Sequence, residues 1–124
     1  MTTDPSTLED LPAAINRATA RLSAAWHRDG FPSVAEYRRG GRTLYKHWRS
    51  LTIGDCEQLV GQHTRAARLA IIRFQGTGSP STARTAAEHI LRTRLYRGLY
   101  RQTLGLARDE GDMPFPLAIC EGNP

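Results

Sequence analysis

Apolar residues recur every three or four positions along most of the chain, the spacing that places side chains on one face of an α-helix. The first such face is formed by Leu11, Ile15, Ala18, Leu22 and Trp26. The second is formed by Cys56, Val60, His63, Ala67, Ala70 and Phe74, and the third by Leu91, Leu95, Leu99 and Leu106. We therefore predict three long helices, over about residues 11–28, 53–74 and 82–107.

The segment between the first two long helices predicts shorter elements. Ser33 is followed three residues later by Glu36, a capping-box pattern that opens a helix, and Gly40-Gly41 interrupts that helix. We expect one or two short helices, over about residues 34–39 and 42–50. Thr52 and Asp55 repeat the capping pattern at the start of the second long helix.

No alternating run typical of a strand stands out, so the predicted fold class is all-α, a small helical bundle. Residues 1–108 are expected to form a single helical domain, and residues 109–124 an acidic, proline-containing C-terminal tail.

Composition is that of one globular domain. The chain has 124 residues, of which 40% are hydrophobic and 23% charged, and its mean hydropathy is −0.47. No apolar run reaches the roughly 18 residues of a membrane span, and no basic leader opens the chain, so we expect a cytoplasmic protein without membrane contact. Two cysteines, 64 residues apart, offer neither a disulfide framework nor paired zinc ligands.

Positive charge is concentrated in two blocks. The chain carries 17 Lys and Arg against 12 Asp and Glu, and all but Lys46 of the 17 are Arg. Residues 31–50 hold four Arg and one Lys against one Glu, a net charge of +4. Residues 82–108 hold six Arg against one Glu, a net charge of +5, whereas residues 109–124 carry −4 and could fold back on them.

The first block mixes cations with aromatic side chains. Guanidinium groups neutralise phosphates, and aromatic faces stack on bases, so this mixture is typical of nucleic-acid binding. Its candidate contacts are Arg38, Arg39, Arg42, Lys46 and Arg49, interleaved with Tyr37, Tyr45 and Trp48. The alternative is that the aromatic residues belong to the core and the cations form a solvated rim.

The second block forms a stripe on the last predicted helix, made of Arg94, Arg97, Arg101 and Arg108. Like charges at helical spacing repel one another, so an anionic partner or solvent must lie against them. A phosphate backbone and an acidic protein surface both fit, and so does an ordinary solvated helix face. The nucleic-acid hypothesis assumes that the two basic blocks converge on one surface of the folded molecule.

Residues 29–48 also resemble a known DNA-binding segment. Gly30-Phe31, Ser33-Val34-Ala35-Glu36 and Thr43-Leu44-Tyr45-Lys46-His47-Trp48 are similar to the helix-turn-helix of the tetracycline-repressor family. The resemblance implies that a recognition helix places Thr43, Tyr45, Lys46 and His47 near DNA, with the preceding arginines near phosphates. The spacing departs from the family, because Ser33 and Tyr45 are twelve residues apart instead of about sixteen, and the rest of the chain does not match.

The sequence gives little support for catalysis or metal binding. Cys56 and His63 share one helix face but lie two turns apart, too far for a hydrogen bond, which favours a core histidine. No carboxylate pair, nucleophile motif or metal cluster stands out, so we expect no enzymatic activity, no cofactor and no metal.

The sequence thus favours a small basic protein that binds nucleic acid, with duplex DNA preferred and a homodimer possible. The alternative is a protein-interaction module, an adaptor or inhibitor of a larger assembly, that docks its arginines on an acidic partner.

Overall fold

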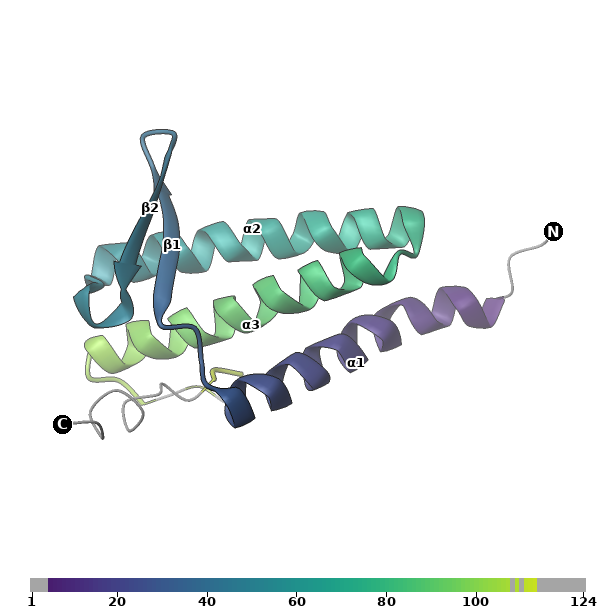
Figure 1. Cartoon of the computed structure of the whole chain (residues 1–124), viewed down its shortest axis with the longest axis horizontal. Coiled ribbons are helices and arrows are strands. Elements are labelled where there is room, and N and C mark those ends of the chain that lie inside the picture. Colours follow the sequence, from purple (N-terminus) through teal and green to yellow (C-terminus); the bar gives the residue numbers. More distant parts are fainter. Residues whose placement is uncertain (1–4, 108, 110, 114–124) are drawn as a thin grey trace.

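The computed structural model describes residues 5–107, 109 and 111–113, and it is mostly helical (Figure 1). Three long helices are present: α1 (Pro5–Asp29), α2 (Ile53–Thr77) and α3 (Pro80–Thr103). Between α1 and α2 lie strand β1 (Val34–Arg39), strand β2 (Arg42–His47) and the 3₁₀ turn η1 (Trp48–Ser50). Helices α2 and α3 lie side by side, and α1 packs against α3.

The predicted all-α class is wrong, because residues 34–39 and 42–47 form an antiparallel β-hairpin instead of two short helices. Along β1, Ala35 and Tyr37 are buried and their neighbours are exposed, the period-two pattern of a strand with one covered face. Gly40 and Gly41 have φ of +59° and +76°, as a two-residue hairpin turn requires. The glycine pair is therefore a turn between strands, and the Ser33–Glu36 capping pattern does not open a helix.

The long helices differ from prediction mainly at their ends. Helix α1 begins at Pro5 instead of residue 11, and α3 ends at Thr103 instead of residue 107. Leu106 therefore lies beyond α3 and is 54% exposed, although its spacing placed it on the buried face. The start of α2 is as predicted, since Thr52 and Asp55 form a complete capping box.

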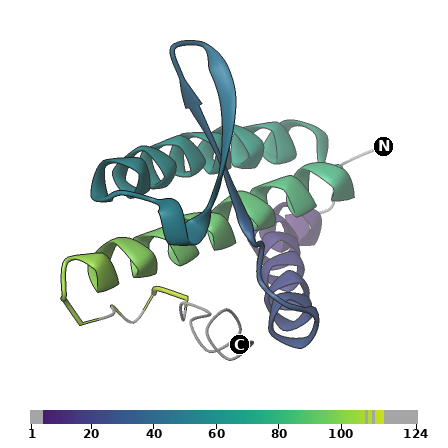
Figure 2. The same ribbon diagram turned by 60° about the vertical axis from the view of Figure 1, so that its left-hand side comes forward.

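The main hydrophobic cluster of the described residues lies where the hairpin crosses the α2–α3 pair (Figure 2), and two smaller clusters lie elsewhere among the helices. The buried side chains of the main cluster come from all three helices, from β1 and from the segment after α3. They are Trp26, Ala35, Tyr37, Leu59, Leu91, Leu95, Tyr96 and Met113. Burying this apolar face stabilises the hairpin, because a two-stranded ribbon by itself is at best marginally stable in water.

Candidate nucleic-acid interface

The tip of the hairpin carries three exposed arginines. Arg38 and Arg39 end β1, and Arg42 begins β2 just after the glycine turn. The strand register places Arg39 directly opposite Arg42. Within the described part of the chain, no carboxylate pairs with any of the three guanidinium groups. In both views the tip projects beyond α2 into open space (Figures 1 and 2).

Lys46, another cation of the first basic block, is less accessible to a ligand than the tip arginines. Lys46 donates a hydrogen bond of 2.8 Å to Asp55, whose side chain is 5% exposed. Burial alone would raise the pKa of Asp55, but hydrogen bonds from Lys46 and from the Thr52 N–H outweigh it and lower that pKa. The charge of Lys46 is therefore neutralised inside the protein, which weakens the prediction that it contacts phosphate.

The other predicted contacts of this block lie on or just after β2, a strand and not the recognition helix that the family resemblance implied. Tyr45 is 67% exposed, whereas Thr43 is half-buried. The Nδ1 atom of His47 accepts a hydrogen bond from the Arg49 N–H, and the Arg49 guanidinium lies 5.9 Å from the ring centre of Trp48. Tyr45, His47, Arg49 and the tip arginines are the predicted contacts of the block that are exposed and could reach a ligand.

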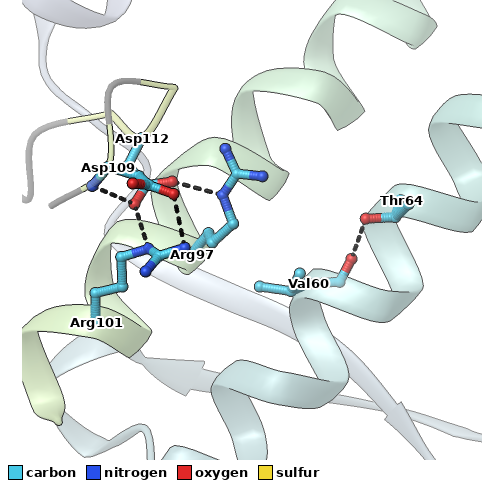
Figure 3. A network of polar contacts seen from close by, with 6 residues as sticks. All are labelled: Val60, Thr64, Arg97, Arg101, Asp109 and Asp112. Atoms are coloured by element: carbon cyan, nitrogen blue, oxygen red, sulfur yellow. Dashed lines mark hydrogen bonds and ion pairs between the residues drawn. The ribbon is translucent and has the colours of Figure 1, made fainter. Parts of the chain in front are cut away.

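Two arginines of the stripe on α3, Arg97 and Arg101, are paired with carboxylates of the chain itself. A strap, which we define as residues 109 and 111–113, lies along α3 and brings two aspartates to it (Figure 3). The buried carboxylate of Asp112 accepts a hydrogen bond from Arg97 and lies 2.9 Å from Nε of Arg101. Asp109 pairs with Arg101 as well. Arg94 is exposed, and Arg108 lies outside the described residues.

The strap is held by the backbone as well as by charge. The Met113 N–H donates to the Arg94 carbonyl oxygen, and the Met113 side chain is 5% exposed within the main core. At Gly98 a Cβ atom would lie 2.6 Å from the Met113 carbonyl oxygen, so only glycine lets the strap approach α3 this closely. The strap is an integral part of the fold.

The two basic blocks do not converge. The hairpin tip lies on one side of the α2–α3 pair and the strap lies on the other (Figures 1 and 2). Arg97 and Arg101 of the second block are paired with the strap. The expectation of a single surface built from both blocks is therefore wrong. Helix packing, which the linear charge count does not contain, separates the blocks.

Helix α2, and not α3, supplies the cation next to the hairpin, which is Arg65. Gln62 of α2 accepts a hydrogen bond from the Arg38 N–H at 3.0 Å and donates one to the Glu36 carbonyl oxygen at 3.2 Å. This side chain occupies the free edge of β1 and fixes the hairpin on α2. Arg38 and Arg65 consequently line one pocket of about 680 Å³, together with Glu57, Gln58, Gly61, Gln62, Ala66 and His89.

His89, which lines this pocket, is paired with the buried His63. The Nδ1 atoms of His63 on α2 and His89 on α3 are 2.9 Å apart, and the His63 ring stacks on Tyr96. Burial, followed by the nearby His89 and Arg92, lowers the pKa of His63 to about 4. The His63 Nε2 and Tyr96 hydroxyl atoms are buried without a hydrogen-bond partner in the described structure. His63 is thus a hydrogen-bonded core histidine, as its spacing from Cys56 suggested.

Sequence reasoning missed Gln62, Arg65 and His89 as members of a site. Gln62 lies 26 residues from the strand edge that it binds, and His89 lies 26 residues from His63. No periodicity or motif links positions so far apart in a single sequence. The one signal that could have been read concerns the hairpin alone, because a Gly-Gly pair between two short segments rich in aromatic and β-branched residues is typical of a β-hairpin turn.

Comparison of the chain with protein-family models, with curated proteins and with solved structures finds no match. No helix in the described part of the chain combines the length and hydropathy of a membrane span. Among the same residues, no three His, Cys, Asp or Glu side chains gather as a metal site would require.

Proposed function

We propose that this protein is a cytoplasmic nucleic-acid-binding protein that contacts duplex DNA through the tip of its β-hairpin. The observation that carries the proposal is the projecting two-stranded ribbon, whose exposed Arg38, Arg39 and Arg42 lack carboxylate partners among the described residues. A two-stranded ribbon fits the major groove of B-form DNA, and arginine binds both phosphate oxygens and guanine edges with paired donors.

The register at the tip supports an anionic ligand. Like charges directly opposite each other on paired strands destabilise a hairpin, and Arg39 faces Arg42 in this way. A phosphate between the two strands would relieve that repulsion. Arg65, which shares a pocket with Arg38, adds a further cation beside the ribbon. We had expected the α3 arginines to supply this second group of positive charge.

The test is a salt titration of DNA binding. We expect Arg39→Ala/Arg42→Ala to lower duplex affinity by about tenfold or more at low salt. The slope of log K against log salt concentration should fall by about 0.9 for each phosphate contact that is lost. Arg17→Ala/Arg21→Ala removes the same charge from exposed positions on α1, which lies on the other side of α3 from the tip, and serves as the matched control.

If both double variants lost the same amount of duplex affinity, net charge alone would attract DNA, and the assignment of the hairpin as the contact would be wrong. Parallel titrations with single-stranded DNA and with duplex RNA test the groove argument. The deep, narrow major groove of A-form RNA excludes such a ribbon, so we expect duplex DNA to bind most tightly. Light scattering of the free protein and of the complex tests the predicted homodimer.

A protein-interaction module is the second candidate, and one observation favours it. Leu69 and Ile72 on α2 are 56% and 63% exposed, and Arg68 and Arg73 lie beside them in the sequence. An apolar pair edged by arginines fits a partner helix with an acidic rim. Retention of a defined partner from nuclease-treated lysate, lost in Leu69→Ser/Ile72→Ser but kept in Arg39→Ala/Arg42→Ala, would favour this function over DNA binding.

A further inference from the structure

The pocket beside the hairpin draws cationic or protonatable groups from three elements. Arg38 reaches it from β1, Arg65 from α2 and His89 from α3. Glu57 is the only carboxylate among its lining residues and is exposed at the rim. With a volume of about 680 Å³, the pocket has room for a phosphate group and an attached nucleoside.

The hydrogen bond between His63 and His89 determines which ring nitrogen of His89 remains to bind a ligand in the pocket. The two Nδ1 atoms share one hydrogen bond, so only one of them carries a proton. His63 is 5% exposed and its low pKa, about 4, keeps it neutral at pH 7. When His89 is protonated, its Nδ1–H can donate to Nδ1 of His63, and its Nε2–H, at the opposite edge of the ring, remains for the pocket.

Burial and charges on α3 and β1 act on His89. Burial is the largest influence and lowers its pKa; Glu88 and Glu36 raise it, and Arg92 lowers it. The net effect is a pKa below the ordinary value of 6.5, so the imidazole is neutral at pH 7 when the pocket is empty. A dianion between Arg38 and Arg65 would favour the imidazolium and reverse this balance.

We propose that this pocket binds a phosphomonoester and that binding is coupled to the uptake of one proton by the His63–His89 pair. The proton comes from solvent and moves to His89; no covalent bond of the ligand forms or breaks. Two guanidinium groups and one imidazolium match a phosphate dianion better than the single charge of a phosphodiester. The ligand chemistry is shared by free nucleotides, inorganic phosphate and the 5′-phosphorylated end of a strand. The inference goes beyond duplex binding and does not depend on it.

The experiment is calorimetric titration of the full chain with inorganic phosphate, AMP and a 5′-phosphorylated oligonucleotide. Repeating each titration at pH 7.5 in phosphate-free buffers of different ionisation enthalpy measures the protons taken up. We expect a net uptake approaching one proton. Arg65→Gln should lower affinity about tenfold and retain the uptake, whereas His89→Gln should lower affinity and abolish the uptake.

Two further variants separate a binding role from a structural one. Glu57→Gln removes the carboxylate from the exposed rim and should raise affinity severalfold, a gain that damage to the fold cannot produce. Arg68→Gln, one helical turn beyond Arg65 and outside the pocket lining, should change nothing. Circular dichroism confirms that each variant is folded.

The three probes identify the source of the phosphate. Tightest binding of the phosphorylated oligonucleotide, with a loss when its 5′-phosphate is removed, assigns the site to a strand end; equal binding of AMP assigns it to free nucleotides. Absence of binding heat with all three probes overturns the proposal, and so does unchanged proton uptake in His89→Gln. Arg39→Ala/Arg42→Ala should retain phosphate binding even though it loses duplex DNA, so the two proposals fail separately.

Discussion

The two arginine clusters of this protein have similar charge but very different surroundings. At the hairpin tip, Arg39 and Arg42 face each other in the open, and no described carboxylate lies against them. On α3, Arg97 and Arg101 share the buried carboxylate of Asp112, and Asp109 lies at the edge (Figure 3). The α3 cluster therefore contributes to folding, whereas the tip cluster costs stability and is free to bind a ligand.

A count of charge along the chain therefore does not show which charges remain exposed. The segment around α3 carries the larger excess, yet Arg97 and Arg101 pair with the acidic strap that follows α3 in the sequence. Substitutions at the α3 cluster should therefore change stability, whereas substitutions at the tip should change binding.

The largest effect is expected at the strap. Asp112→Ala removes a buried acceptor shared by two arginines and should lower the free energy of unfolding by about 2–3 kcal/mol, measured by urea denaturation. Asp109→Ala is the control, since its side chain is 64% exposed and its loss should cost less than about 1 kcal/mol. Equal effects of the two variants would show that the strap is not anchored through Asp112.

The contribution of Asp112 should also depend on pH. Burial alone would raise its pKa, but the hydrogen bond from Arg97 and the charges of Arg97 and Arg101 lower it below the ordinary 3.8. A carboxyl whose pKa is lower in the folded state stabilises above its unfolded pKa and loses that effect as the pH falls through the folded value. The stability difference between wild type and Asp112→Asn should thus be constant from pH 7 to about pH 4 and shrink below it. A difference that grows in acid would contradict the assigned ion pair.

A smaller effect tests the hairpin turn itself. Gly40→Ala places a side chain at φ +59° and should destabilise the protein by about 1–2 kcal/mol. Gly76→Ala, within α2 and with open space around it, should instead stabilise by up to about 1 kcal/mol. If thermal melting showed both substitutions to be stabilising, residues 34–47 would be helical and the hairpin would be wrong.

The smallest change in stability is expected at the tip, where it should oppose the change in binding. Arg42→Glu replaces a repulsive pair across the strands with an attractive one and should stabilise the protein by about 0.2–1 kcal/mol. The same variant should weaken binding of duplex DNA more than Arg42→Ala does. Gel-shift titration and chemical denaturation of one preparation measure both quantities, and a variant that gains in both would exclude the tip from the DNA contact.

Prediction from sequence succeeded where the determinants were local. The helical period located the buried residues Phe74, Leu91 and Leu95, and the Thr52–Asp55 pattern located the start of α2. The hairpin was missed although its signal is also local, because Ser33 and Glu36 favoured a helix start. Burial of Ala35 and Tyr37 against the helices selects the strand instead.

The helical periods, the cap of α2 and the excess of arginine follow from the amino-acid sequence alone, because these features depend on residues a few positions apart. The folded structure was needed to show that Gly40-Gly41 is a turn between strands, which arginines remain exposed, that Gln62 fixes the hairpin on α2, and that His63 meets His89. Those outcomes depend on how α2 packs on α3 and on where the strap lies. Packing of this kind brings together groups that no local pattern connects.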